Sequence, residues 1–178
     1  MNALSVRELE KSDIGLIAEY WLNATPEFLL GMGVDLNRMP SFDEIEAALL
    51  EQLSLEIPEK KSYCIIWQVD GKPVGHSNIN KIQFGLEAFM HLHLWQPETR
   101  QKGIGVNLVK MTLPFFFEKY QLKTLFCEPY ALNPAPNKTL EKVGFRFVKE
   151  HITIPGAINF EQPARLWEMS RERFLSLP

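Results

Sequence analysis

A short stretch in the middle of the sequence places cations and glycines directly before a helix-like pattern. Residues 95–111 read WQPETRQKGIGVNLVKM, in which Arg100, Lys102, Gly103 and Gly105 lie close together. The start of a helix presents unpaired backbone N–H groups at the positive end of its dipole, and this combination binds phosphates and other anions. Glycines let the main chain approach such a ligand closely. The stretch therefore predicts an anion-binding loop, with an ordinary helix start as the alternative.

Three kinds of phosphate loop join a strand to a helix in this way. A dinucleotide fingerprint requires a third glycine at position 108, where Leu108 stands. A nucleoside triphosphate loop requires Gly-Lys-Ser or Gly-Lys-Thr after four residues, and the stretch contains neither. The remaining kind is the loop with which acyltransferases bind the pyrophosphate of coenzyme A.

Residues 100–105 resemble the coenzyme A loop of the GCN5-related N-acetyltransferase (GNAT) family, in which Arg or Gln, two residues, Gly, one residue and Gly or Ala follow a strand. A second motif of this family is an Asn followed eleven residues later by Gly-Phe, with Glu-Lys shortly before the Gly. The residues that match it are Asn133, Glu141, Lys142, Gly144 and Phe145. The resemblance extends over residues 60 to 150, and the second motif is most similar to the branch with ribosomal-protein, aminoglycoside and siderophore-type acetyltransferases.

The apolar pattern of the whole chain predicts alternating strands and helices. Expected strands cover 3–9, 87–95, 123–130, 145–154 and 164–174, with a hairpin over 62–79 that turns at Asp70-Gly71. Expected helices cover 14–21, 41–55 with a Ser41/Glu44 capping box, the segment after the glycine loop, and 137–142 before Gly144. We expect residues 26–40 to form a long irregular connection.

The resemblance implies a GNAT-like α/β (α+β) fold. This is a mixed, mainly antiparallel sheet of six to seven strands, flanked by helices, with two splayed central parallel strands. We expect a single domain over residues 1–178, with 1–60 as the variable acceptor-side part and 60–150 as the acetyl-CoA-binding core.

The resemblance also implies acetyl-CoA as cosubstrate and assigns residues to it. Backbone N–H groups from Gln101 to Val106 should cradle the pyrophosphate, and backbone groups of residues 93–95 should pair with the pantetheine arm as an added strand. Asn133 should bind the arm, unless it serves only as a helix N-cap. The implied coenzyme A site comprises Leu94, Trp95, Arg100, Gln101, Lys102, Gly103, Ile104, Gly105, Val106, Asn133, Asn137 and Lys138.

An acceptor amine must lose a proton before it attacks a thioester, because an ammonium has no lone pair. In the GNAT family the base is often a Glu or His on the strand before the phosphate loop, which indicates His91 or His93, and Glu128 on the next strand is a third candidate. Each of them has a plain structural alternative as a hydrogen-bonded or paired residue. Many members place a tyrosine as general acid where this chain has Leu140, so Tyr130 is the substitute candidate.

Charge is distributed unevenly along the chain. Residues 1–98 contain 15 acidic and 7 basic residues, a net charge of −8, and residues 99–178 contain 7 and 12, a net charge of +5. The acceptor-side acids Glu27, Asp35, Asp43, Glu44 and Glu46 favour a cationic amine, unless they form an ordinary acidic surface. The sequence thus predicts an N-acetyltransferase for a small amine, with a noncatalytic acyl-CoA-binding module or an O-acetyltransferase as alternatives.

Other classes of function find little support in the sequence. The net charge of −3 indicates neither a nucleic-acid nor a membrane partner, and no window approaches about 18 uncharged apolar residues. Cys64 and Cys127 lie in apolar runs and are expected to be buried free thiols. No metal is expected, because His76, His91, His93 and the two cysteines lack zinc-site spacing. We expect a cytoplasmic monomer or homodimer.

Overall fold

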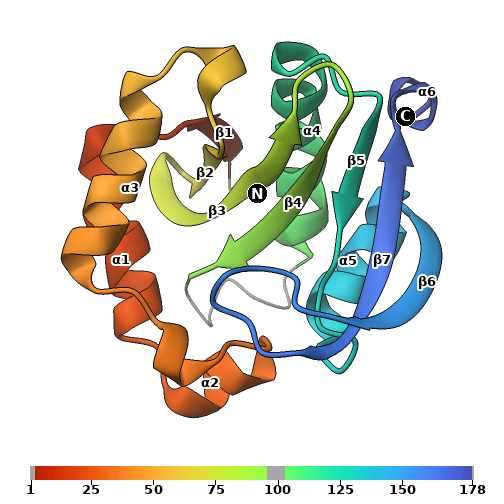
Figure 1. The fold of residues 1–178 in the computed structure, drawn as a ribbon. Coiled ribbons are helices and arrows are strands. Elements are labelled where there is room, and N and C mark those ends of the chain that lie inside the picture. The colour runs from red at the N-terminus through yellow and green to blue at the C-terminus, as the bar shows by residue number, and fades with distance from the viewer. Residues whose placement is uncertain (1–2, 96–102, 178) are drawn as a thin grey trace.

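The computed structural model describes residues 3–95 and 103–177, which form a seven-stranded sheet covered by helices on both faces (Figure 1). The strand order is β1-β2-β3-β4-β5-β7-β6. Only β4 and β5 are parallel to each other, and all other neighbours are antiparallel. The strands are β1 (Leu4–Glu8), β2 (Tyr63–Val69), β3 (Lys72–Gln83), β4 (Glu87–Leu94), β5 (Thr124–Cys127), β6 (Arg146–Thr153) and β7 (Gln162–Ser170). The predicted mixed sheet with two central parallel strands is confirmed.

Helices from the two halves of the chain cover opposite faces of this sheet (Figure 1). The α-helices are α1 (Ile14–Leu22), α2 (Pro26–Gly31), α3 (Phe42–Ser54), α4 (Ile104–Lys119), α5 (Pro134–Val143) and α6 (Arg171–Leu175). Short 3-10 turns cover Lys11–Asp13, Leu36–Arg38 and Ile57–Glu59. α1 and α3 lie over the β2 region, whereas α4 and α5 lie on the other face.

The main core lies between the sheet and α4. Leu113, Phe116 and Phe117 of α4 are fully buried against strand residues such as Met90 and Leu125. A smaller cluster under α1 and α3 contains Ile17, Cys64 and Ile66, with Trp21, Leu49 and Trp95 packed against it. Both cysteines are buried and free, as expected.

Local signals in the sequence act as predicted. Ser41 and Glu44 form the reciprocal capping box at the start of α3. Asp70 and Gly71 both have positive φ, at 49° and 75°, which is the backbone of a type I′ hairpin turn. Gly144 ends α5 in the left-handed conformation, with φ 109°.

Two predicted segments are wrong. Residues 26–40 are not one irregular connection, because the Thr25 hydroxyl accepts a hydrogen bond from Phe28 N and Pro26 occupies the first turn, which together start α2. The predicted last strand over 164–174 ends at Ser170, whose side chain accepts from Arg173 N and caps α6. The predicted strand over 123–130 is also shorter, since β5 ends at Cys127.

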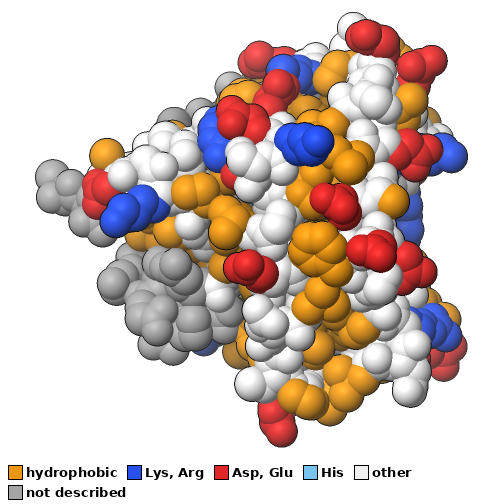
Figure 2. Space-filling model, turned by 90° about the vertical axis from the view of Figure 1, so that its left-hand side faces the viewer, with side chains coloured by type: hydrophobic (Ala, Val, Ile, Leu, Met, Phe, Trp, Pro, Cys, Tyr) orange, Lys and Arg blue, Asp and Glu red, His pale blue; other side chains and the backbone are white. Residues whose placement is uncertain are grey.

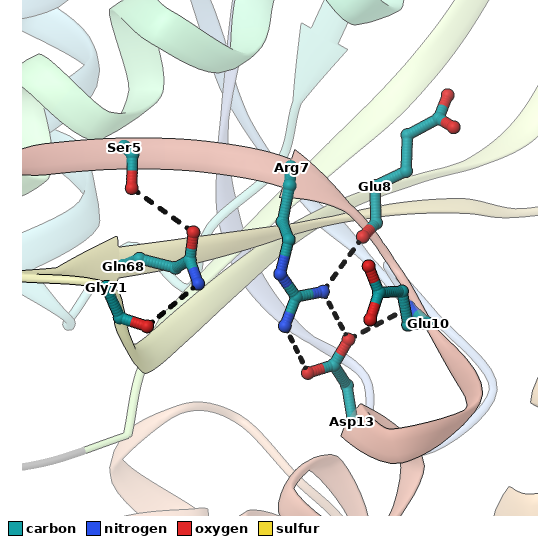
Figure 3. Close-up of polar contacts among 7 residues, drawn as sticks. All are labelled: Ser5, Arg7, Glu8, Glu10, Asp13, Gln68 and Gly71. Carbon is teal, nitrogen blue, oxygen red and sulfur yellow. Dashed lines mark hydrogen bonds and ion pairs between the residues drawn. The ribbon is translucent and has the colours of Figure 1, made fainter.

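An ion pair with a buried carboxylate connects β1 to the turn that precedes α1. Figure 3 shows the guanidinium of Arg7 on β1 facing the carboxylate of Asp13, with Nη1–Oδ2 and Nη2–Oδ1 distances of 2.6 and 2.7 Å. The backbone N–H of Glu10 donates to the same carboxylate at 2.9 Å. Because Asp13 is only 2% exposed, these bonds replace its hydration and anchor α1 to the edge of the sheet.

Candidate active site

The parallel strands β4 and β5 diverge in the middle of the sheet. They pair only at Glu87–Thr124, Ala88–Leu125 and Phe89–Phe126, after which β4 continues to Leu94 without β5 beside it. The chain after β5 stays beside β7 instead, where Arg165 N donates to Pro129 O and Ala131 N donates to Pro163 O. A proline at 129 has no N–H to continue a ladder with β4. The result is a gap in the sheet between the end of β4 and residues 127–130.

A cavity of about 430 Å³ adjoins this gap on the face covered by α1 and α3. Its walls come from both halves of the chain: α1 and α3 contribute apolar side chains such as Ile17, Trp21 and Leu49, and β3 and β4 contribute Asn78 and His91. Residues 127–130 and the loop between β6 and β7 close the remaining sides. The volume suits a small molecule.

The segment after α2 and the β6–β7 loop meet over this cavity (Figure 1). Val34 and Asn159 form an isolated antiparallel bridge, and Asp35 N donates to Ile158 O at 2.8 Å. The side chains of Asn159 and Gln162 each donate to Gly33 O at 2.9 Å. We call these two segments, 32–35 and 156–162, the cavity strap. It joins the N-terminal part of the chain to the C-terminal strands at the cavity wall.

His91 lines the cavity at the centre of the sheet, opposite Asn78 on β3. Its Nε2 atom is buried and has no hydrogen-bond partner among the described residues. Burial lowers the pKa of His91 to about 4, with a smaller contribution from Lys81. The ring is therefore neutral at pH 7 and can donate one hydrogen bond and accept another.

His93 also lines the cavity but belongs to an aromatic cluster with α1. The Tyr20 hydroxyl lies 3.2 Å from His93 Nδ1, and the ring of His76 stacks on that of His93 at 4.8 Å. Trp95 Nε1 donates to His76 Nδ1 at 2.8 Å. Sequence reasoning did not find Tyr20, because an aromatic residue on a helix carries no local signal of a partner 73 positions away. The cluster orients His93, and its members Trp21, His76 and His93 line the cavity.

Glu128 and Tyr130 line the cavity just beyond the end of β5. Glu128 Oε1 lies 2.8 Å from Nε2 of His151 on β6, and the Glu128 side chain is 9% exposed. The ring of Tyr130 packs edge-on against Phe160 of the cavity strap. Sequence reasoning missed His151, because no motif connects an edge-strand histidine to a carboxylate on another strand.

Helix α4 begins beside the end of β4. Gly103 precedes it with φ 72°, a conformation that glycine adopts without strain. A Cβ added to Gly105 would lie 3.8 Å from Leu94 Cδ1, so the first turn of α4 reaches the last residue of β4. Ile104 and Val106 pack against the main core. The other predicted loop residues, Arg100, Gln101 and Lys102, lie outside the described residues.

The predicted site residues near α5 have internal partners. Asn133 caps the helix by accepting from Ala135 N at 3.3 Å, and it also lines the cavity. Asn137 is buried: its Oδ1 accepts from Trp167 Nε1, and its Nδ2 donates to the carbonyls of Tyr130 and Asn133. Asn137 therefore fixes the cavity-lining segment from within the protein.

Two more positions that the motifs single out, Lys138 and Leu140, lie on opposite sides of α5, one exposed and one buried. Lys138 is exposed on α5. Leu140 is fully buried in the main core, so no hydroxyl takes the place of the tyrosine expected at this position.

Of the acidic residues predicted at the acceptor side, Glu44 lines the cavity. Its carboxylate also accepts from Ser41 N at 2.7 Å within the capping box. The lining residues in the described part of the chain do not include Glu27, Asp35, Asp43 or Glu46, nor any Lys or Arg. Figure 2 shows acidic side chains on both sides of a band of hydrophobic ones on the outer face of the N-terminal helices. Most of the acidic excess therefore faces outward.

No group of three or more His, Cys, Asp or Glu side chains within residues 3–95 and 103–177 is placed to hold a metal ion. The described helices include none that is long and apolar enough to cross a membrane.

The family model for the acetyltransferase (GNAT) domain matches residues 3–146. The chain belongs to the GNAT family. A search among curated proteins gave no match. Among solved structures, the spermidine N-acetyltransferase from Vibrio cholerae in complex with CoA and spermine has a TM-score of 0.79 and 18% identity, over 97% of this chain and 98% of that chain. The aminoglycoside acetyltransferase AAC(6')-Ib in complex with coenzyme A has a TM-score of 0.72 and 15% identity, over 97% and 98%. These two enzymes share the fold of this GNAT chain.

Proposed function

We propose that this GNAT chain is an acetyl-CoA-dependent N-acetyltransferase that acts on the primary amine of a small, cationic acceptor. The observation that carries the proposal is the gap between β4 and β5 at the wall of a 430 Å³ cavity. An extended ligand can add to a strand at the point where the next strand diverges from it. The gap thus offers a path along which a thioester reaches a cavity large enough for a second substrate.

The coenzyme A side of the site would be formed by the start of α4 and the end of β4. Backbone N–H groups at the first turn of a helix, from Gly103 to Val106, are suited to the pyrophosphate. Leu94 and Trp95 lie where the pantetheine arm would pair, and Asn133 lies at the cavity wall. Coenzyme A in the two solved relatives supports this assignment. The remaining residues assigned by the motifs, Arg100, Gln101, Lys102, Asn137 and Lys138, belong to the proposal on the sequence alone.

The acceptor side favours an amine that carries positive charge and an apolar body. The described lining contains two carboxylates, Glu44 and Glu128, and no Lys or Arg. Glu44 is exposed and bonded within its capping box, so the carboxylate in the partly dehydrated part of the cavity is that of Glu128, which attracts a cation. Apolar residues from α1 and α3 cover much of the remaining wall. The spermine bound to one solved relative is a cationic amine of this general kind.

The reaction needs one proton acceptor close to the amine. The ammonium gives a proton to the base, its nitrogen attacks the thioester carbonyl carbon, and the C–S bond breaks to release a thiolate. A thiolate with a pKa of about 8.5 leaves without prior protonation, and Tyr130 is the nearest predicted donor for it. Of the three predicted bases, Glu128 offers negative charge as well as a proton site. Neutral His91 and the oriented His93 are suited to hydrogen bonding with the amine.

Calorimetric titration with acetyl-CoA tests the cofactor site. We expect micromolar binding by the wild type and by Gly105→Ala, whose Cβ has room, and no binding by Gly105→Glu, which places a negative charge at the phosphate site. Absence of binding by folded wild-type protein would refute the coenzyme A assignment.

A panel of primary amines, with detection of the released thiol, tests the reaction. Turnover that falls at least tenfold in Glu128→Gln or His91→Ala identifies the residue that handles the amine proton. Binding of acetyl-CoA without turnover of any amine or alcohol would indicate an acyl-CoA-binding module instead. Turnover of alcohols alone would indicate an O-acetyltransferase.

A further inference from the structure

An edge-strand histidine reaches inward to the cavity carboxylate. In β6, which ends the sheet, only His151 and Thr153 are half-buried, and the other residues of the strand are exposed. His151 Nε2 lies 2.8 Å from Glu128 Oε1, across a sequence separation of 23 residues. The histidine side chain is 28% exposed and is absent from the cavity lining, whereas the glutamate is 9% exposed and lines the cavity. His151 therefore stands behind Glu128 as seen from the cavity.

The backbone that carries Glu128 is already held in place. Pro129 O and Ala131 N are hydrogen-bonded to β7, and Tyr130 forms an isolated bridge with Ala164. A fixed backbone does not fix the three side-chain torsions of Glu128, so a contact at the carboxylate is needed to restrict them. His151 supplies that contact at Oε1, while no hydrogen bond to Oε2 occurs within the described residues.

We infer that His151 is a positioning residue that holds the Glu128 carboxylate with one oxygen turned to the acceptor amine, an inference that rests on the proposed amine acetylation. An ionised carboxylate only accepts hydrogen bonds, so the ring nitrogen that faces Oε1 carries the hydrogen. This contact occupies Oε1 and leaves Oε2 as the oxygen that can receive the amine proton. The proton of the acceptor ammonium then passes to Oε2, and its nitrogen keeps the electron pair that attacks the thioester carbonyl carbon.

A purely structural role is the competing explanation, because the contact also fastens β6 to the rest of the molecule. A second side-chain pair in the same part of the sheet provides a matched control. Arg165 Nε on β7 donates to Glu150 Oε2 on β6 at 3.0 Å, and both side chains are exposed away from the cavity lining. Glu150→Gln weakens a β6 contact without touching Glu128.

The test compares five variants with the wild type on an amine that the wild type acetylates. His151→Phe keeps a ring but removes the N–H donor, and we expect kcat to fall about 10- to 100-fold with an unchanged KM for acetyl-CoA. His151→Gln retains an N–H donor and should recover most of the lost kcat. Glu150→Gln should match the wild type. In a Glu128→Gln background, His151→Phe should cause no further loss, because the residue acts through Glu128.

Each outcome has a distinct meaning. Wild-type kcat in His151→Phe, or equal additional losses in the presence and absence of Glu128, would overturn the positioning role and leave the acetyltransferase proposal intact. A loss in His151→Phe that tracks a lowered melting temperature, and that Glu150→Gln reproduces, would show a structural role only. A wild type that acetylates no amine would overturn both proposals.

Discussion

Replacing Gly33 by alanine should damage the cavity strap while leaving the proposed coenzyme A side intact. Gly33 has φ 80°, and an added Cβ would lie 1.8 Å from Gln162 Oε1 and 2.5 Å from its Cδ. Gln162 cannot move at low cost, because it is 1% exposed and its Nε2 donates to Gly33 O and to Phe160 O. The substitution therefore forces a strained backbone and displaces a buried amide.

The magnitude follows from these two effects. Alanine in the left-handed region costs about 1 kcal/mol relative to glycine. Displacing Gln162 removes two hydrogen bonds of about 1 kcal/mol each, and the stranded buried groups add a comparable penalty. The total is about 4 to 5 kcal/mol of unfolding free energy. For a chain of this size that corresponds to a melting temperature lower by about 10 °C.

Gly31→Ala is the matched control two residues away. Gly31 ends α2, and a Cβ there meets nothing within 4 Å, so alanine should leave stability unchanged or raise it by about 0.5 kcal/mol. Calorimetric melting of both variants measures the difference, and titration with acetyl-CoA should give the wild-type affinity for each. A Gly33→Ala protein that melts within about 2 °C of Gly31→Ala would refute the strap geometry.

Three further predictions concern other parts of the molecule. Asp13→Asn should lower the unfolding free energy by about 2 to 3 kcal/mol in denaturant titrations, because it leaves Arg7 without its buried partner. A loss below about 0.5 kcal/mol would contradict the anchoring role of that pair. Burial lowers the pKa of His76 to about 3 and of His91 to about 4, so only the unfolded chain binds protons at these two histidines between pH 6.5 and 5. The free energy of unfolding should therefore fall by about 2 kcal/mol for each pH unit of acidification in that window. His91→Gln should halve this slope. Equal slopes in the two proteins would contradict a neutral buried His91. Leu140→Tyr should lower the free energy of unfolding by about 1 to 3 kcal/mol, because it overpacks a fully buried site. We expect no gain in acetylation rate, and a faster enzyme would show that a tyrosine at this position can act as a proton donor.

Much of the fold was predictable because its signals are local. The capping box at Ser41, the turn at Asp70-Gly71 and the helix end at Gly144 each depend on a few adjacent residues, and each occurs as predicted. The two wrong segments failed at short helices, α2 and α6, whose caps at Thr25 and Ser170 precede too few residues to establish a helical period.

The sequence by itself determined the family and predicted where the proposed cofactor loop lies, since both depend on the spacing of residues within single motifs. Only the tertiary structure decided which predicted polar residues meet. Tyr20 contacts His93 across 73 positions, and Gln162 contacts Gly33 across 129. Such contacts arise where strands from distant parts of the chain share a sheet, and no local pattern encodes them. The shared sheet also brings His151 to Glu128, so the proposed positioning residue could be found only in the tertiary structure and not in a motif.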